Sequence, residues 1–539
     1  MKTHRKSLAM LLALVMVAAL VLSGCGAPAA TTPPPAAGNT PGPAAATPQP
    51  ANTRPVTVVP DTLTIGIASE PGGLDVHQYA DGAGVGVVVN FCEGLMFRNN
   101  DTYEYEPWLA NSWETLDEYT TRFHLRDDVY FHDGGHMTAD DVLFTFERGN
   151  ELPARRFAYT PFDIPNCRVV DDYTIDIVSK TPFAPALAYL SSTGVFIHSR
   201  ESVANTTLQE YNRNPVGVTG AYRFSEWIAG DRIILERNED YWGVMPEFKY
   251  LVFRIMTDAT ARTLAIESND IDILMAPLSS SIASLSQNPD VEVLVSFGLS
   301  TTNILFNNQH PVLSDQRVRE ALLWAIDIPG MSNIAFSGTG EPGSAFVAPI
   351  IPGWHAPDPN GPWVNQNLDK ARALLADAGY ADGFDIEIWC NENQARIDIA
   401  EMLQNAWGAI GVRCEVSVLE FATQIAQMDE GLHDVSLNGF VPPGLDMDFA
   451  YSQLHSGPWS QNYMGYNNPE VDRLFELGRS SLNQEERIAS YSKIIDIYRE
   501  EIPSISMHHQ TQFYVIRSTL TGLENHPQNL PHFYLVHSK

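Results

Sequence analysis

The sequence predicts an α/β fold that extends over more than one domain. With 539 residues the chain is too long for one simple domain, and its length suggests two to four. Residues 384–390 read FDIEIWC, a helical pattern follows at 395–409, and GVRCEVSVLE follows at 411–420. This strand–helix–strand order predicts two parallel strands joined by a right-handed crossover. A further helix is predicted where apolar residues recur at the helical period, at Val318, Ala321, Leu322 and Ala325.

The first 24 residues predict a signal peptide. Lys2, Arg5 and Lys6 precede the apolar run LAMLLALVMVAALVL, which is shorter than the ~20 residues that a membrane-spanning helix needs. The junction LSGC resembles the lipobox of bacterial lipoproteins, which implies that Cys25 is the lipidated first residue of the mature protein. The alternative is a chance cysteine behind an ordinary signal peptide, because small residues also suit simple cleavage.

Residues 25–58 are rich in Ala, Pro, Thr and Gly and nearly free of charge, which predicts a disordered tether behind the lipidated cysteine. The expected location is therefore the cell envelope, with the protein anchored to the outer face of the cytoplasmic membrane in an extracellular or periplasmic setting. A formal charge of -32 disfavours nucleic acid as a partner, since phosphate binding needs clustered Lys and Arg.

Four further cysteines, Cys92, Cys167, Cys390 and Cys414, would reside in a compartment that permits disulfides. They allow three pairings, and the sequence does not choose among them. Parallel neighbouring strands would place Cys390 and Cys414 at opposite ends, which argues against that pair. The absence of a C-x-x-C spacing disfavours a zinc knuckle or a thioredoxin-type site.

The stretch FHDGGHMTADDVLFTFER at 131–148 raises the question of a metal site, because His132 and His136 stand four residues apart. Thr138 and Asp141 form a capping pattern that predicts a helix starting at Ala139. Two glycines and the helix start separate the histidines, so they do not share one helix face. We therefore interpret the stretch as a turn and a helix start, and expect no metal site.

This same region carries a family resemblance. PWLANSWETLDEYTTRFHLRDDVYFHDGGHMTADDVLFTFER, 107–148, resembles the signature of the family 5 solute-binding proteins, the extracytoplasmic receptors of peptide, nickel and related ABC importers. Similar matches follow in order, among them NPVGVTGAYRFSEWIAGDRIILERNEDYWG at 214–243 and NILFNNQHPVLSDQRVREALLWAID at 303–327. The resemblance covers nearly the whole mature chain.

The resemblance implies a periplasmic-binding-protein-like fold of two α/β lobes, joined by a hinge around a ligand cleft, with an extra subdomain on lobe one. Carried onto this chain, lobe one comprises 60–100, 210–305 and 495–539. The subdomain comprises 101–209, and lobe two comprises 306–494.

The resemblance further implies a monomeric substrate-binding lipoprotein that captures a solute, most simply a dipeptide or oligopeptide, between closing lobes. It would deliver this solute to ABC permease subunits with their ATPases, and no cofactor is expected. The alternatives are an oligosaccharide, a nickel or other metal chelate as ligand, or a sensory lipoprotein of the same fold.

Motifs of enzymes are weak in this chain. GTGEPG at 338–343 follows a helix and contains Pro342, so we interpret it as a surface loop rather than a dinucleotide-binding loop. SYSK at 490–493 lies in an amphipathic helical pattern, and chance accounts for it. His508 and His509 lack spaced partners. We therefore expect a binding protein and not an enzyme.

Candidate ligand residues follow from the resemblance. The segment after the first strand contributes Tyr79, Ala80 and Asp81, and the loop at 438–449 contributes Gly439 and Phe440. In peptide-binding members an aspartate of that loop holds the peptide amine, but the corresponding position here is Pro442.

Either Asp446 or Asp448 of the same loop replaces the missing acid, or the ligand has no free amine to hold. The alternative for both aspartates is that they only cap a helix or face solvent. Trp389 ends a strand at the edge where open α/β sheets bind ligands, with core packing as the equal alternative.

Overall fold

The computed structural model describes residues 61–539 except Ala80, Asn100, Asp101, Tyr103, Pro153, residues 458–460, Asn525 and Asn529. The predicted signal peptide, the lipidation site at Cys25 and the predicted tether lie outside the described residues. None of the described helices is both long and apolar enough to cross a bilayer.

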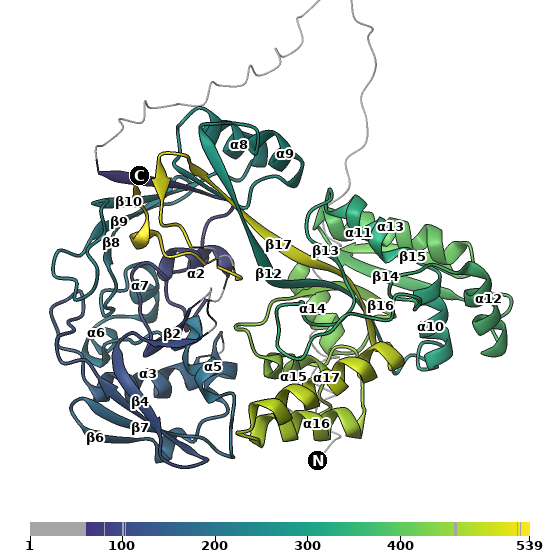
Figure 1. Ribbon diagram of the computed structural model, residues 1–539, viewed down its shortest axis with the longest axis horizontal. Coiled ribbons are helices and arrows are strands. Elements are labelled where there is room, and N and C mark those ends of the chain that lie inside the picture. The colour runs from purple at the N-terminus through teal and green to yellow at the C-terminus, as the bar shows by residue number, and fades with distance from the viewer. Residues whose placement is uncertain are drawn as a thin grey trace, which may run out of the picture. The chain divides into compact units, whose positions relative to one another are not determined.

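One mixed sheet of eleven strands runs through both lobes of the α/β fold (Figure 1). Its order is β15 (Arg413–Leu419), β14 (Asp385–Asn391), β16 (Val435–Phe440), β12 (Val291–Phe306), β17 (Ser504–Arg517), β11 (Ile273–Met275), β1 (Thr62–Ile67), β10 (Tyr250–Ile255), β9 (Arg232–Arg237) and β8 (Tyr222–Ile228), with β13 (Glu341–Pro342) paired to β17. The first three strands belong to lobe two and the last five to lobe one.

The long strands β12 and β17 run from one lobe into the other (Figure 1). In lobe one β12 pairs antiparallel with β17 up to Phe297, and in lobe two their pairing resumes at Thr301. A register shift separates the two stretches, at Gly298, where an added Cβ would lie 2.5 Å from the Gln510 carbonyl oxygen. The two crossing strands are therefore irregular where they pass between the lobes.

The described residues build separate apolar cores. Lobe two encloses the largest core, in which Trp407 packs beside Phe306, and lobe one encloses a second around Phe253 and Phe533. A third core, with Phe146 at its centre, lies under a four-stranded sheet of the order β4 (Ala110–Thr115), β5 (Thr120–Leu125), β7 (Thr174–Val178), β6 (Arg168–Asp171). We call the elements around this third core the subdomain.

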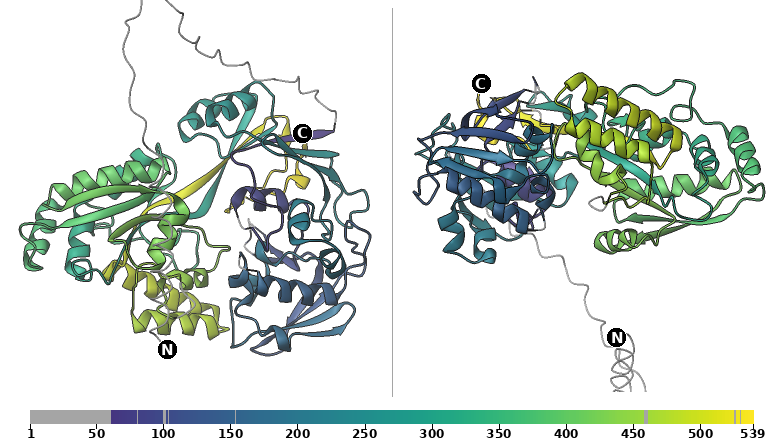
Figure 2. Two further views of the ribbon diagram at one scale, coloured as in Figure 1. Left: turned by 180° about the vertical axis from the view of Figure 1, so that it is seen from behind. Right: turned by 90° about the horizontal axis from the view of Figure 1, so that it is seen from below.

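The helices surround these cores. Lobe one carries α2 (Gly82–Val88), α8 (Ala259–Glu267) and α9 (Ile282–Leu285), and the subdomain carries α3 (Ala139–Glu151), α4 (Arg156–Tyr159), α5 (Ala186–Leu190), α6 (Arg200–Ala204) and α7 (Leu208–Arg213). Lobe two carries α10 (Gln316–Trp324), α11 (Ile328–Ala335), α12 (Leu368–Asp377), α13 (Gln394–Gly408), α14 (Phe421–Asp429), α15 (Tyr451–Leu454), α16 (Pro469–Ser480) and α17 (Gln484–Glu501). Helices α16 and α17, yellow-green in Figure 2, pack against each other.

The predicted strand–helix–strand unit is confirmed as β14, α13 and β15, with the two strands parallel. Cys390 lies opposite Val418 and Cys414 opposite Ile386, so the two cysteines stand at opposite ends of the strand pair. Both are free thiols, as are Cys92 and Cys167.

The predicted helix start is also confirmed. Helix α3 begins at Ala139, and the Asp141 carboxylate accepts a hydrogen bond from the Thr138 backbone N–H (3.0 Å). The His132 ring bonds the Gly220 carbonyl (2.9 Å), whereas the His136 ring bonds the Asp127 carbonyl (3.0 Å). The two imidazoles thus serve the turn as hydrogen-bonding side chains.

The interpretation of GTGEPG as a surface loop was wrong in part. Glu341 and Pro342 form β13, which pairs with His509 and His508 of β17. The glycines permit this approach, because a Cβ at Gly340 would collide with the ring of His508. His508 is buried and stacked on Phe336 at a centroid distance of 3.6 Å, so it belongs to the core of lobe two.

Candidate ligand-binding site

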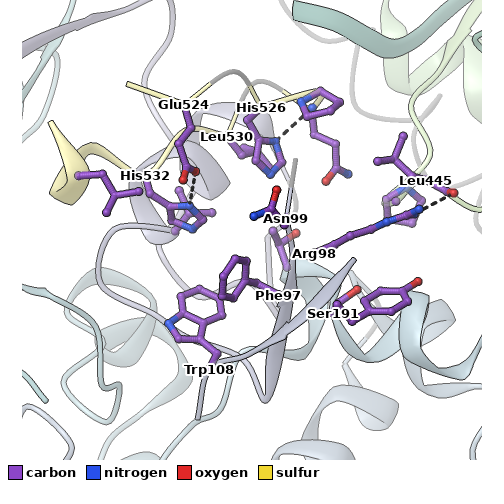
Figure 3. Close-up of a pocket in the computed structure, with 18 of the residues that line it drawn as sticks. Phe97, Arg98, Asn99, Trp108, Ser191, Leu445, Glu524, His526, Leu530 and His532 are labelled. Atoms are coloured by element: carbon purple, nitrogen blue, oxygen red, sulfur yellow. Dashed lines mark hydrogen bonds and ion pairs between the residues drawn. The ribbon is translucent and has the colours of Figure 1, made fainter. Parts of the chain in front are cut away.

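A cavity with a volume of about 580 Å³ is lined from both lobes (Figure 3). Lobe one contributes the end of β2 (Met96–Arg98), the strand β3 (Tyr105–Pro107) and described residues of the C-terminal segment 522–537, which lies between β18 (Leu520–Thr521) and β19 (His537–Ser538). Lobe two contributes the loop 443–445 that follows β16. A volume of this size suits a small organic ligand.

An aromatic wall closes one side of the cavity. Phe97 and Phe196 both pack edge-on against Trp108, at centroid distances of 5.8 and 6.1 Å. Trp108 is fixed in place because its indole N–H donates to the buried Glu93 carboxylate (2.8 Å). Apolar walls with a few placed polar groups are typical of ligand sites.

Glu93 is the centre of a buried network beneath this wall. Its carboxylate also accepts hydrogen bonds from the Thr219 hydroxyl (2.8 Å), the Tyr241 hydroxyl (2.7 Å) and the Trp242 indole (3.1 Å). Burial raises the pKa of Glu93, and these hydrogen bonds act in the opposite direction. The network positions Trp108 and does not itself face the cavity.

Charged side chains stand at different places around the cavity (Figure 3). Arg98 donates to the Leu445 carbonyl (3.0 Å) and so joins lobe one to the loop of lobe two. Glu524 stands 3.5 Å from Nδ1 of His532, whose ring lies edge-on to Trp108 at 5.6 Å. Gln528 adds a second connection between the lobes, because its side chain donates to the Pro442 carbonyl (3.1 Å).

Tyr79 and Asp81, carried over from the segment after β1, are not among the described residues that line this cavity. Tyr79 is exposed, and Ala80 lies outside the described residues. Asp81 is the N-cap of α2, where its carboxylate accepts hydrogen bonds from the backbone N–H groups of Gly84 (2.8 Å) and Gly72 (3.2 Å). The structure therefore gives Asp81 a local structural role.

The loop at 438–449 lines the cavity with Pro443, Gly444 and Leu445 and not with its acids. Gly439 and Phe440 lie in β16, and Phe440 packs on Phe346 at 5.0 Å. Asp446 forms an ion pair with Arg487 of α17 (2.8 Å). Asp448 is completely buried. Neither carboxylate lines the cavity.

Asp448 instead joins lobe two to the subdomain. Its carboxylate accepts a hydrogen bond from the Tyr189 hydroxyl (2.9 Å), and Nε of Arg479 stands 3.2 Å away. The ring of Phe449 stacks on Tyr189 at 4.7 Å and packs into the core of the subdomain. Trp389, in contrast, is buried within the core of lobe two, at 6% exposure, which matches the core-packing alternative.

One group of described side chains has the spacing of a metal site, Asp75, His77 and His198. Arg148 occupies it, because its guanidinium bonds both oxygens of Asp75 and Nδ1 of His77 (2.7 Å). Burial lowers the pKa of His198 to about 3, so this ring is neutral. The cluster is a buried salt-bridge network of the subdomain and lobe one, and a metal cation would have to displace a guanidinium.

Comparison with known proteins fits this geometry. The model of the bacterial extracellular solute-binding proteins, family 5, matches residues 104–462, which is more than half of the chain. The protein belongs to this family. Its members are solute-binding proteins, and the two-lobe fold with a cavity lined from both lobes is the form expected of a family 5 protein.

Relatives of this chain include the dipeptide-binding protein of Escherichia coli (strain K12), 26% identical over 80% of this chain and 86% of the relative. Heme-binding protein A of Haemophilus influenzae is 28% identical over 82% of this chain and 85% of the relative. Among solved structures, the periplasmic binding protein DppA from Helicobacter pylori, in complex with the peptide STSA, aligns with a TM-score of 0.77. It is 25% identical and covers 88% of this chain and 98% of its own.

Sequence reasoning missed the C-terminal segment 522–537 and the β2–β3 hairpin as cavity walls. The segment GLENHPQNLPHFYLVH has no helical or alternating pattern, and only its histidines and asparagines mark it as unusual. Its place beside lobe two depends on β17, which returns the chain from lobe two to lobe one before the segment begins.

Proposed function

We propose that this protein captures a short peptide in the cavity between Trp108 and the loop 443–445, and delivers it to the permease of an ABC importer. The observation that carries the proposal is a cavity of about 580 Å³ with walls from both lobes and an aromatic side, whose described lining includes one arginine and one glutamate. Peptides carry an ammonium, a carboxylate and apolar side chains, which match those groups. The dipeptide-binding relative supports this choice of ligand class.

Capture would work by closing the lobes around the ligand. The Arg98–Leu445 and Gln528–Pro442 hydrogen bonds form only when the loop of lobe two lies against lobe one. The irregular crossing of β12 and β17 at Gly298 is the proposed hinge. A ligand that contacts both lobes stabilises the closed form, and its apparent affinity is reduced by whatever closing costs in the empty protein.

The test is native mass spectrometry of the chain from residue 26 onward, purified from cells grown in rich medium. A co-purified peptide mass that disappears on denaturation is expected. The refolded protein should then bind dipeptides and tripeptides in a calorimetric titration. An empty protein that binds neither would contradict the proposal.

A metal chelate such as haem is a second candidate, because His526, His532 and His537 all line the cavity. Burial lowers the pKa of His526 to about 3, so its imidazole is neutral, which is the form that binds metals. This candidate predicts a bound transition metal by elemental analysis and a haem absorbance band in the purified protein. Heme-binding protein A is the relative that favours it.

We also propose that lipidation of Cys25 anchors the protein at the outer face of the cytoplasmic membrane. The LSGC junction and the tether behind it support this. Labelling with a fatty acid should mark the wild-type protein and not Cys25→Ala, and the variant should leave the membrane fraction. Equal labelling of both would remove the anchor from the proposal.

A further inference from the structure

We propose that Glu524 binds the ammonium group of the captured peptide, in place of an acid from the loop of lobe two. This inference rests on the proposed function and names the group of the cavity that would recognise the ligand's amino terminus. Among the described residues that line the cavity, Glu524 is the only one with a carboxylate (Figure 3). Three observations support it.

The first observation is that no carboxylate of the loop of lobe two lines the cavity. Pro442 stands where an acid would be expected, and its carbonyl already accepts from Gln528. Asp446 is paired with Arg487 at 2.8 Å, and Asp448 is fully buried beside Arg479. Both carboxylates are turned away from the cavity into contacts that hold the loop, so an ammonium in the cavity would need another anion.

The second observation is the state of Glu524 itself. Its side chain is 41% exposed, and its described contact is Nδ1 of His532 at 3.5 Å. A charge-assisted hydrogen bond between nitrogen and carboxylate is shorter, ~2.7–2.9 Å. The carboxylate is therefore positioned by the imidazole without being saturated by it, and can accept a closer and fully charged donor.

The third observation is the aromatic surface next to Glu524. His532 lies edge-on to Trp108 at 5.6 Å, and Phe97 lies edge-on to the same indole at 5.8 Å. A cation next to a carboxylate and over an aromatic face gains from both interactions. Arg98 stands elsewhere on the wall, bonded to Leu445 of lobe two. This separation of charges favours a peptide that presents its amine to the C-terminal segment and its carboxylate toward the loop of lobe two.

The ligand class follows from this arrangement. The site should accept peptides with a free amino terminus and discriminate against the same peptides when the amine is acetylated, because acetylation removes the charge and two donors. It should place little restriction on the side chains that meet the apolar wall.

The experiment is calorimetric titration of the chain from residue 26 onward, after unfolding and refolding to remove bound ligand. The probes are Ala-Ala, Ala-Phe, Ala-Lys and Ala-Glu, each with its N-acetylated form. For the wild type we expect at least one free dipeptide to bind about tenfold or more tightly than its acetylated form, the factor that one charged hydrogen bond supplies. Glu524→Gln should lose that preference, and Glu524→Asp should retain part of it.

The matched control is Glu292→Gln, which removes an exposed carboxylate that is paired with Lys539 (3.1 Å) and does not line the cavity. It should bind every probe as the wild type does. Melting temperatures of all variants separate loss of binding from loss of fold.

Four results would overturn the inference. Glu524→Gln that binds like the wild type, or a wild type that binds acetylated and free dipeptides equally, leaves the proposed function intact and removes Glu524 as the anchor. If Asp446→Asn abolishes the preference for free over acetylated dipeptides and Glu524→Gln keeps it, the ammonium group binds to the loop of lobe two instead. A wild type that binds no probe contradicts the proposed peptide function and the anchor together.

Discussion

The Asp75–Arg148 pair of lobe one and the subdomain differs from the Asp448–Arg479 pair at the contact between lobe two and the subdomain. Both carboxylates are fully buried. Arg148 bonds both oxygens of Asp75, and the backbone N–H of His77 adds a third donor (3.1 Å). Burial acts to raise the pKa of Asp75, but Arg148 outweighs it and holds the pKa well below its usual range.

At the Asp448–Arg479 pair, burial outweighs the effect of the arginine on the pKa of the aspartate. Nε of Arg479 approaches Asp448 to only 3.2 Å, one hydrogen bond comes from Tyr189, and the carboxylate of Asp446 is close enough to disfavour a second negative charge. Burial therefore prevails and raises the pKa of Asp448 to about 6.

The difference shows that burial alone does not fix the charge of an aspartate; the number and geometry of its donors do. The donors of Asp75 all come from lobe one and its subdomain. Asp448 receives part of its partners from the subdomain, across a contact that must separate when the lobes open. A carboxylate with fewer donors leaves that contact weaker, which suits a receptor that has to release its ligand.

The largest expected effect comes from breaking the complete pair. Arg148→Met should destabilise the protein by ~3–5 kcal/mol, because it leaves Asp75 as a buried carboxylate without its cation. Arg479→Met should be milder, by about 1–2 kcal/mol, since Asp448 can take up a proton instead. Urea unfolding followed by circular dichroism measures both. Equal losses would show that the two pairs do not differ as described.

The second prediction concerns pH. Because the folded pKa of Asp448 is about 6 and an unfolded aspartate titrates near ~3.9, the folded state binds the proton more tightly. The stability from this group is fully present below about pH 4 and is lost as pH rises through about 6. Asp75, whose folded pKa is lowered, acts in the opposite direction and loses its contribution as pH falls below ~3.9.

The contribution of Asp448 is measured by comparing the unfolding free energies of the wild type and Asp448→Asn between pH 4 and pH 7. The wild type should lose on the order of 2 kcal/mol more than the variant over that range. Parallel curves for the two proteins would show that Asp448 titrates alike in the folded and unfolded chain.

Much of the fold was open to prediction from the sequence, because local patterns specified it. Thr138 and Asp141 marked the start of α3, and the strand–helix–strand pattern marked β14, α13 and β15. These features depend on residues within one or two turns of each other. The family motif then supplied the two-lobe arrangement, which no local pattern contains.

The site was predicted less well, because its contacts join distant parts of the chain. Loop position suggested Asp446 and Asp448 as ligand acids, but the arginines that pair with them come from α16 and α17, tens of residues later. Glu524 entered the cavity only because β17 returns the chain to lobe one. Sequence spacing carries no record of such long-range pairing.

The third prediction tests the contact between the lobes directly. Tyr189→Phe removes the hydroxyl that donates to Asp448 while keeping the ring stacked on Phe449. We expect a loss of about 1 kcal/mol from the closed form and, through it, an apparent ligand affinity lowered roughly fivefold. Titration with a dipeptide that the wild type binds measures the affinity. Small-angle scattering of the empty protein measures the loss of the closed form. An unchanged affinity would mean that this hydrogen bond is also present when the lobes are open.

The smallest effect on stability is expected for an arginine–aspartate pair that faces solvent. Arg413 bonds both oxygens of Asp385 at 2.6 and 3.0 Å, a geometry as complete as that of Arg148 with Asp75, but both side chains are more than half exposed. Water solvates the two charges when they separate, so their contact adds little to stability. Arg413→Met should leave the urea midpoint unchanged within error. Because Arg148→Met makes the same substitution in a buried bidentate pair, the two variants isolate the contribution of burial, and a large shift for Arg413→Met would show that geometry alone decides the strength of these pairs.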